Sequence, residues 1–303
     1  MAQRPAFSLA PADSSRHPVQ VAYYDFDWSP GMSAAQKRKN VAALHASIRE
    51  RILGAKPLEV SSKSTLPIGI ALSAFNLAVV KNGQPFRVES LYQGSKVFRD
   101  GSGPFHDLYA QSPKAVRAAI KPHASSPLVH FAWGRTHWPL EPKLAFYTWL
   151  YCTALHHVQN RPLADKLLRE EFTHFTDIEY NPGRTLNSQS FAVAYYLHLV
   201  RTAQADAVLV DRDTFLGVFP AGLPEGFRTE SARRSPAPAA GIRKIAMTQV
   251  HGALGDRALP RKSRQTGTPQ GRAGSPSTPP QMKIGPIANC RRRPAQSASP
   301  LQP

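Results

Sequence analysis

The segment VESLYQGSKVF, residues 88–98, carries three polar groups whose types suit acid–base or nucleophilic chemistry. Glu89, Gln93 and Lys96 are spaced by four and then three residues, which is the repeat of a helix. At about 100° per residue, Gln93 lies roughly 40° and Lys96 roughly 20° from Glu89, on opposite sides of it. The spacing therefore predicts a helix that presents a carboxylate, an amide and an amine in one narrow stripe. The other side of this helix is formed by Val88, Leu91, Tyr92, Ser95 and Phe98.

Two interpretations of the stripe are open at this point. The polar face of a surface helix is usually only solvated, and an acid with a distant lysine then has no chemical role. Alternatively, the three groups line a site. The number of polar groups does not decide between them, so the neighbouring segments matter.

The segments before this helix are predicted from their residue patterns. VQVAYYDF, residues 19–26, is rich in β-branched and aromatic residues and predicts a strand. Ser33 with Gln36 is a capping-box pattern, and the apolar repeat that follows predicts a helix over 33–53. PLEVSS, residues 57–62, predicts a second strand. Asn82-Gly83 lies between two apolar runs and predicts a tight hairpin.

The segments after it alternate between helix and strand patterns. Helices are expected over 113–120, 141–158, 162–172 and 188–203, because apolar residues recur there at helical spacing. Strands are expected over 127–133 and 174–182, the second of which ends at a proline. Many helices of moderate length with a few short strands indicate a mixed, helix-rich α+β fold.

Charge and proline divide the chain into three parts. Residues 220–303 carry fourteen Lys/Arg against three Asp/Glu, a net charge of +11 out of the total of +18, and 13 of the 28 prolines. Such a segment cannot bury enough apolar surface to offset its ordering entropy, so it is expected to be a disordered basic tail. Residues 1–18 are expected to be a flexible leader. Residues 19–219 are expected to form one catalytic domain, long enough for a full-sized hydrophobic core.

Several classes of protein are disfavoured by the sequence. It contains no P-loop, no GxGxxG in a strand–helix context, no GxSxG and no HExxH, so no cofactor is expected. The adjacent His156 and His157 cannot share one helix face, and no metal site is expected. Cys152 and Cys290 are the only cysteines, and no apolar run is long enough to span a membrane. A cytoplasmic location with no membrane contact is therefore expected.

Two motifs carry a resemblance to a known family. The segment LSAFN at 72–76, followed by the hairpin and then by Glu89, Gln93 and Lys96, resembles the pattern of the NADAR superfamily. In that family a leucine-serine-asparagine-phenylalanine-tyrosine segment precedes a Glu-His-x-x-Gln-x-x-Lys helix. This chain has Ala74, Asn76 and Ser90 where the family usually has asparagine, tyrosine and histidine. The resemblance implies a single domain of the YbiA-like N-glycosidase fold.

A closer resemblance covers roughly residues 19–210. QKRKNVAALH, LEVSSKS, LSAFNL, VESLYQGSKVF, FYTWLY and FTDIEYNP are similar, in this order, to the NADAR branch that accompanies a DNA ADP-ribosyltransferase toxin. Its members are antitoxins. The resemblance implies an N-glycosidase that removes ADP-ribose from guanine bases of DNA, with ADP-ribosylated DNA and a cognate toxin as partners.

This reaction gives each residue of the stripe a role. Cleavage of an N-glycosidic bond builds positive charge at the anomeric carbon. Glu89 is the candidate that stabilises this charge or activates water. Lys96 is the second catalytic candidate, and it either holds a phosphate or the leaving base, or attacks an opened sugar to form a Schiff base. Gln93 would fix orientation, and Ser73, Phe75 and Asn76 would contact the substrate.

Further candidates come from other segments. Asp177 and Glu179 alternate along the expected strand and would hold ribose hydroxyls, unless they lie on a solvated edge. Asn187 and Gln189 open the last expected helix, where Asn187 either contacts substrate or caps the helix. Trp133 either stacks on a base or belongs to the core. Lys63 either binds phosphate or is merely exposed.

Two other functions remain open at the level of sequence. One is a NADAR glycosidase acting on a small metabolite, such as a riboflavin-pathway intermediate. The other is a non-catalytic antitoxin that binds the toxin, or that binds nucleic acid through the basic tail, which would be sensitive to salt.

Overall fold

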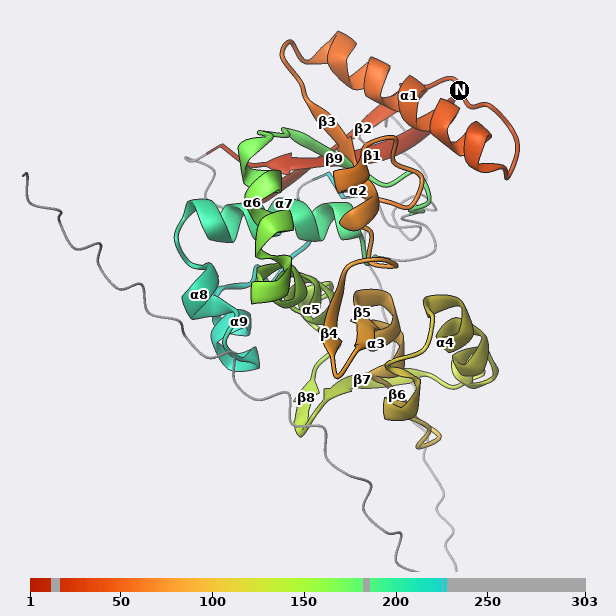
Figure 1. Ribbon diagram of the computed structural model, residues 1–303, viewed down its shortest axis with the longest axis vertical. Helices are drawn as coiled ribbons and strands as arrows, with labels where there is room; N and C mark the ends of the chain where they lie inside the picture. Colours follow the sequence, from red (N-terminus) through yellow and green to blue (C-terminus); the bar gives the residue numbers. More distant parts are fainter. Residues whose placement is uncertain (12–16, 182–185, 225, 228–303) are drawn as a thin grey trace, which may run out of the picture.

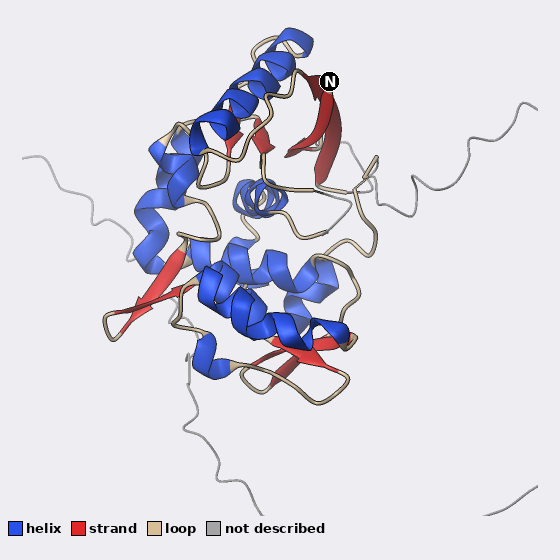
Figure 2. Ribbon diagram, turned by 90° about the vertical axis from the view of Figure 1, so that its right-hand side faces the viewer, coloured by secondary structure: helices blue, strands red, loops and turns tan. Residues whose placement is uncertain are grey.

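The computed structural model describes residues 1–11, 17–181, 186–224 and 226–227, and it has the expected α+β class (Figure 1). Most of the basic tail expected over 220–303 lies outside the described residues. A four-stranded sheet with α1 lies at one end of the molecule. Two smaller sheets lie at the other end, and most of the remaining helices lie between (Figure 2). No helix in the described part is long and apolar enough to cross a membrane.

The larger sheet is covered by a helix on each face. Its strands are β1 (Ala2–Leu9), β2 (Val19–Phe26), β3 (Pro57–Glu59) and β9 (His174–Thr176), in the order β2-β1-β9-β3. β1 is antiparallel to both neighbours, and β3 is parallel to β9. Because side chains alternate along a strand, Ala6 packs with Leu44 of α1 (Ala34–Arg51). The next residue, Phe7, packs edge-on against Phe191 of α7 (Gln189–Arg201) on the opposite face.

The position of β1 corrects the expected domain boundary. The first residues were expected to form a flexible leader, but β1 pairs with β2 over its whole length and lies inside the sheet. Arg4, Pro5 and Ser8 interrupt the alternation of apolar residues that identifies strands from sequence. The domain therefore begins at the N-terminal strand and not at residue 19.

The central layer is built on α5 (Ala145–His156), which is buried on nearly every side. It packs against α7 and α6 (Arg161–Arg169), and the Tyr151 hydroxyl donates a hydrogen bond to the carbonyl of Leu72 at the end of α2 (Pro67–Ala71). The short helices α8 (Ala205–Val208) and α9 (Arg212–Val218) complete this layer, and Phe215 of α9 packs on Trp138. The expected helices at 141–158, 162–172 and 188–203 are thus confirmed, with shorter bounds.

The other end of the molecule carries Glu89. It contains the hairpin of β4 (Ala78–Lys81) and β5 (Gln84–Arg87), then α3 (Val88–Gly94), α4 (Pro113–Ile120) and the sheet of β6 (Lys96–Phe98), β7 (Leu128–Trp133) and β8 (Thr136–Trp138). Asn82 and Gly83 both have positive φ, 53° and 75°, as the expected tight turn requires. Two 3₁₀ turns, at His106–Leu108 and Lys121–Ser125, connect these elements, and another, at Val158–Asn160, connects α5 to α6.

The helix that carries Glu89 is shorter than its residue pattern predicts. It was expected to run over 88–98, but α3 ends at Gly94. The Gly94 carbonyl accepts a hydrogen bond from the amide of Phe105 (2.7 Å), and the Ser95 carbonyl accepts one from the amide of Ala132 (2.7 Å). These backbone contacts from other segments replace the next helical turn. Lys96 therefore begins a strand that pairs with β7 and does not lie on the helix.

Substitution of Phe7 by alanine tests whether β1 belongs to the core. The Phe7 side chain is 0% exposed, and a buried phenylalanine truncated to alanine costs about 3–5 kcal/mol. Denaturant unfolding should show a loss of this size. Met32→Ala, at a side chain that is 86% exposed, should change the free energy of unfolding by less than about 0.5 kcal/mol. Equal effects of the two substitutions would contradict the assignment of β1 to the core.

Candidate active site

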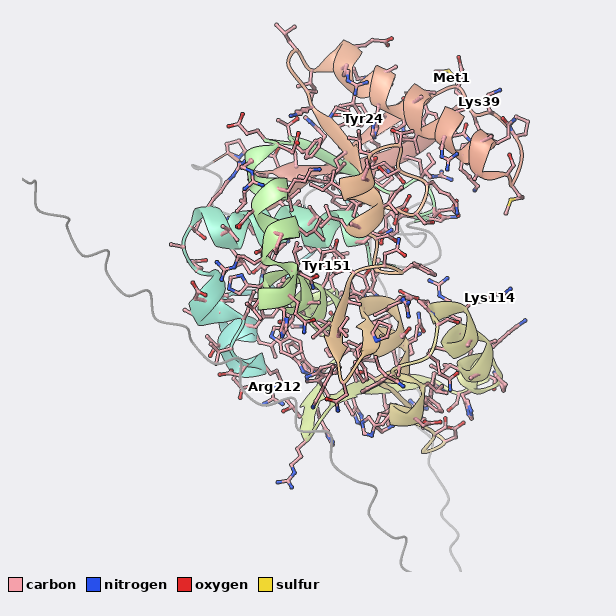
Figure 3. All side chains as sticks on the ribbon, in the orientation of Figure 1. Met1, Tyr24, Lys39, Lys114, Tyr151 and Arg212 are labelled. Atoms are coloured by element: carbon pink, nitrogen blue, oxygen red, sulfur yellow. The ribbon has the colours of Figure 1, made fainter. Side chains whose placement is uncertain are left out.

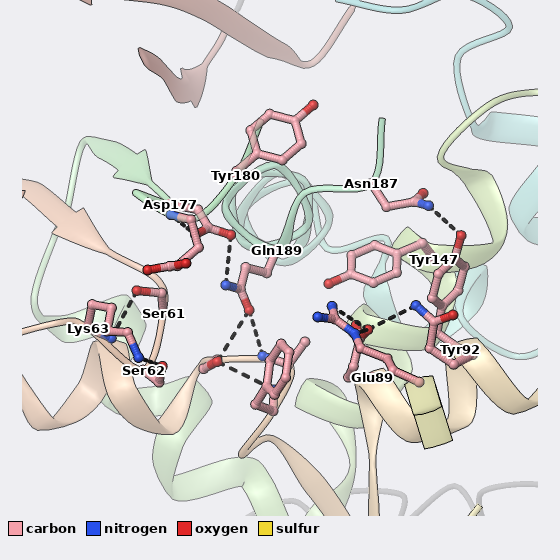
Figure 4. Close-up of a pocket in the computed structure, with 16 residues that line it drawn as sticks. Ser61, Ser62, Lys63, Glu89, Tyr92, Tyr147, Asp177, Tyr180, Asn187 and Gln189 are labelled. Carbon is pink, nitrogen blue, oxygen red and sulfur yellow. Dashed lines mark hydrogen bonds and ion pairs between the residues drawn. The ribbon is translucent and has the colours of Figure 1, made fainter. Parts of the chain in front are cut away.

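A cavity of about 400 Å³ lies beside α3 and α7, within the range of about 300–1,000 Å³ that is usual for ligand sites (Figure 4). Its walls come from segments that are distant in the sequence. They are Ser61, Ser62 and Lys63 after β3; Ser73, Ala74 and Phe75 after α2; Glu89, Tyr92 and Gln93 of α3; Arg117 of α4; Tyr147 of α5; Asp177, Glu179 and Tyr180 after β9; and Asn187 and Gln189 at the start of α7.

Glu89 is a buried carboxylate with a cationic partner. Its side chain is 6% exposed, and Oε1 accepts a hydrogen bond from Nε of Arg117 and forms an ion-pair contact with Nη2, both at 2.7 Å. The same oxygen accepts a hydrogen bond from Gln93 Nε2 at 3.0 Å. All three contacts from described residues are made to Oε1, so Oε2 is left for a ligand in the cavity. The alternative of a merely solvated stripe is therefore wrong for Glu89.

Gln93 joins Glu89 to Lys96. While Gln93 Nε2 donates to the carboxylate, Gln93 Oε1 accepts a hydrogen bond of 2.6 Å from Lys96 Nζ. Lys96 reaches this position from β6, with its ammonium 5.4 Å from the centre of the Tyr92 ring. Burial lowers the pKa of Lys96, the nearby Glu89 carboxylate raises it, and Arg117 lowers it further. The cavity wall includes Gln93 but not Lys96, so the amide lies between the amine and the cavity.

Arg117 also forms the rim of the cavity. Its guanidinium lies over the ring of Phe75 at 4.8 Å from the centroid, in a cation–π contact. Phe75 is 36% exposed, which is unusual for a phenylalanine in a folded domain. The guanidinium is therefore held between a buried carboxylate and a partly exposed aromatic ring.

A second buried acid lies farther along the cavity wall, in the segment after β9 (Figure 4). Asp177 follows β9 and is 8% exposed, and burial together with the neighbouring Glu59 raises its pKa to about 8. Glu59 is 1% exposed, and burial raises its pKa also, against hydrogen bonds from Ser61 Oγ (2.6 Å) and Thr176 Oγ1 (2.7 Å). Two adjacent buried carboxyls cannot both be ionised cheaply, so at neutral pH Asp177 is mainly uncharged.

Gln189 connects Asp177 to the loop after α2. Its Nε2 donates to Asp177 Oδ2 at 2.8 Å, while its Oε1 accepts from the backbone amide of Ala74 at 2.7 Å and from Ser73 Oγ at 3.5 Å. Ser73 Oγ in turn accepts from the amide of Phe75 at 3.4 Å. One side chain of α7 thus fixes the loop that carries Phe75 relative to the acid.

Aromatic hydroxyls occupy the wall between the two acids. Tyr147 stands edge-on to Tyr92, with ring centroids 5.1 Å apart, and its hydroxyl points into the cavity without a hydrogen bond to a described residue (Figure 4). Burial raises the pKa of Tyr147 well above its usual value, so the group stays a neutral donor. The Tyr92 hydroxyl accepts a hydrogen bond from Asn187 Nδ2.

Most of the residues expected in a site line this cavity. They are Glu89, Gln93, Ser73, Phe75, Asp177, Glu179, Asn187 and Lys63. Asp177 and Glu179 do so from a turn, because β9 ends at Thr176 and the amide of Glu179 donates to Asp177 Oδ1 at 3.0 Å. Asn187 does not cap α7, since Ser188 is the residue whose side chain accepts from the amide of Phe191.

Two expected substrate contacts lie outside the cavity wall. Asn76 is exposed, and its Nδ2 donates to the carbonyl of Ile70 at 2.8 Å. Trp133 stacks on Tyr109 at 5.8 Å and meets Trp149 edge-on, so it has the core role that was its alternative. Among the described residues, no group of three or more His, Cys, Asp or Glu is placed to hold a metal ion.

Among the residues at or beneath the cavity that were not identified from sequence, three matter most for the site: Arg117, Tyr147 and Glu59. Tyr147 is hidden within the uniformly apolar α5, and Arg117 belongs to the polar face of a short helix. Of these, only Glu59 could have been noticed in the sequence. It is a single acid in the short strand PLE, and a strand whose residues are all buried leaves its carboxyl in the interior, where it needs hydrogen-bond partners.

The raised pKa of Asp177 predicts how stability depends on pH. Between its ordinary pKa of 3.8 and its folded value of about 8, the folded protein keeps a proton that the unfolded chain has lost. This contribution to stability is complete below about pH 4 and is lost as pH rises through about 8, at up to about 1.4 kcal/mol per pH unit. Chemical denaturation of the wild type and of Asp177→Asn, compared across this range, measures it.

Both proteins contain the same buried histidines, so the contributions of these histidines to the pH dependence of stability cancel when the two proteins are compared. The stability of the wild type relative to Asp177→Asn should fall with rising pH. A difference that stays constant from pH 4 to pH 8, or that grows, would show that Asp177 is ionised in the folded protein.

The chain is similar to a known protein family over most of its length. No curated protein matches the chain. A family model described as DarT1-associated NADAR antitoxin matches residues 2–222, which includes β1, every residue of the cavity wall and the helices up to α9. The match begins at the strand that sequence reasoning had left outside the domain. This chain belongs to the family of DarT1-associated NADAR antitoxins.

Proposed function

We propose that this chain is an N-glycosidase that removes ADP-ribose from guanine bases of DNA, and that this activity makes it the antitoxin of a DNA ADP-ribosyltransferase. The observation that carries the proposal is the buried Glu89 carboxylate, which has one oxygen fixed by Arg117 and Gln93 and the other available to the cavity. Membership in an antitoxin family supports the biological role.

The geometry supports a charge-stabilising role for Glu89. As the bond between sugar and base breaks, positive charge develops at the anomeric carbon, and a fixed carboxylate oxygen next to that carbon stabilises it. Arg117 and Gln93 hold the carboxylate in one orientation, so little reorganisation is needed during the reaction. Oε2 is also suited to accept a proton from the attacking water.

Lys96 is suited to covalent catalysis. Its lowered pKa increases the fraction of neutral amine, which is the nucleophilic form. The amine displaces the base at the anomeric carbon, and the electron pair of the broken bond goes to the base nitrogen, which takes up a proton. Ring opening gives a Schiff base that water hydrolyses to free ADP-ribose. Gln93 must release Nζ for this attack, since it holds the amine behind the cavity wall.

Beside Asp177, the cavity wall suits the diphosphate and the second ribose. Lys63 supplies a positive charge there, with Nζ held by Ser62 Oγ at 3.1 Å. Asp177 is mainly protonated at neutral pH, so it does not repel phosphate and offers a donor to a ribose oxygen. Glu179 lines the same wall and forms an ion pair with Lys37, with Nζ 3.4 Å from Oε1.

Replacement of Glu89 by glutamine tests the reaction. Glutamine keeps the shape but loses the charge, and we expect the rate of ADP-ribose release from guanine-modified DNA to fall by about 10²- to 10⁴-fold. Single-turnover release is measured by chromatography. Glu50→Gln, an exposed acid of α1, is the matched control and should keep the wild-type rate.

The fold of the variant must be checked, because Glu89 pairs with Arg117. Circular dichroism and thermal unfolding show whether a loss of rate comes from unfolding. Release at the wild-type rate by a folded Glu89→Gln protein would rule out this carboxylate as the catalytic group.

Borohydride reduction during turnover tests the role of Lys96. We expect it to link the sugar covalently to the wild-type protein, at Lys96, as mass spectrometry of peptides would show. Lys96→Arg keeps the charge but cannot form a Schiff base, so it should lose both the adduct and turnover. An active Lys96→Arg protein would show that the ammonium acts only by its charge.

Substrate competition separates this function from its alternatives. A metabolite glycosidase would release base from a small glycoside faster than ADP-ribose from DNA. A non-catalytic antitoxin would release neither, yet would still protect cells from the toxin. The proposed enzyme protects cells only while Glu89 is intact.

A further inference from the structure

The net charge of the domain is concentrated in one part of the sequence. Residues 60–140 contain nine Lys/Arg against three Asp/Glu, a net charge of +6, whereas the rest of residues 1–219 contains fifteen against fourteen. No acid occurs between Asp107 and Glu141. This segment includes α3, α4 and both smaller sheets, so the basic half of the domain is the half that carries Glu89 and Arg117 (Figure 1).

Helix α4 and the residue that ends it, Lys121, present three of these cations in a line. Lys114, Arg117 and Lys121 are spaced by three and four residues, which places them on one face of the helix over about 10 Å. All three are exposed, and the opposite face buries Val116 and Ile120. Lys114 projects into solvent (Figure 3). Neither Lys114 nor Lys121 forms an ion pair with a described residue.

The line of cations passes the rim of the cavity. Its middle member, Arg117, lines the cavity and holds Glu89, while its guanidinium covers one face of Phe75. The partly exposed Phe75 ring therefore lies next to the basic face of α4 and next to the cavity. Cations alongside an exposed aromatic ring are the combination that binds single-stranded nucleic acid, with phosphates on the cations and a base on the ring.

We propose that this surface, formed by Lys114, Lys121 and Phe75, holds the DNA strand that carries the modified base. This inference rests on the proposed function and adds the part of the substrate that lies outside the cavity. The two outer lysines lie about 10 Å apart along the helix, so each can contact a different phosphate of one strand. The base next to the modified one stacks on Phe75, and Arg117 stays with Glu89.

Charge reversal of the two outer lysines in the full chain tests the proposal. Lys114→Glu with Lys121→Glu should weaken binding of an unmodified single-stranded oligonucleotide by about tenfold or more, measured by fluorescence anisotropy at fixed salt. The slope of log Kd against the logarithm of salt concentration should decrease in magnitude by about 1.4, because two phosphate contacts are lost. Lys166→Glu with Arg169→Glu, which changes the charge equally on the exposed face of α6, should leave binding within about twofold.

Kinetics add a second readout. For ADP-ribosylated DNA the reversal should raise KM and leave kcat unchanged, while ADP-ribosylated guanosine, which has no phosphate backbone, should be cleaved with unchanged kinetics. Phe75→Ala should also weaken oligonucleotide binding, and Phe75→Tyr should restore it.

The two proposals fail in different ways. If the wild type releases ADP-ribose from neither substrate, the proposed function is wrong, and the anisotropy measurement still decides the binding surface. If the α4 and α6 reversals weaken oligonucleotide binding equally, or neither does, the surface assigned to α4 is wrong while the glycosidase stands.

Discussion

A carboxylate withdrawn from water needs partners, and the pairing of Glu89 with Arg117 is the contact on which the site depends. Glu89 is the buried member, 6% exposed, and leaving its charge without a cation is unfavourable, so the contact between α3 and α4 is favoured although Arg117 itself is 53% exposed. Because both guanidinium contacts and the Gln93 amide bind the same oxygen, the charge is satisfied from one side and the other side is open to the cavity. The ion pair is thus both a packing constraint and a way to orient the acid.

The two buried acids of the cavity wall have different surroundings. Glu89 is balanced by a cation, whereas burial, together with the carboxyl of Glu59, keeps Asp177 mainly neutral. A ligand with a developing positive charge and a diphosphate fits this arrangement. It meets a negative group at the sugar, and at the phosphates it meets acids that are neutral, as Asp177 is, or paired with a cation, as Glu179 is with Lys37. The Gln189 amide connects Asp177 to the loop bearing Phe75, so the loop and the acid are positioned by the same helix.

The sequence predicted well what local patterns control and poorly what long-range contacts control. The hairpin at Asn82-Gly83, the cap at Ser33 and the long helices follow from neighbouring residues alone. The end of α3 does not, because amides of Phe105 and Ala132 take the carbonyls that would continue it. Lys96 still reaches Gln93, from a strand and not from a helix face. Arg117 and Tyr147 could not be predicted, since nothing near them in the sequence marks them as neighbours of Glu89.

The proposed reaction requires one orientation of the substrate in the cavity, and a crystal structure with ADP-ribose bound measures it directly. We predict that the anomeric carbon of the terminal ribose lies about 3–3.5 Å from Glu89 Oε2 and that the diphosphate lies near Lys63. A structure with the sugar beside Lys63 and the diphosphate on Arg117, or with ADP-ribose bound outside this cavity, would contradict it.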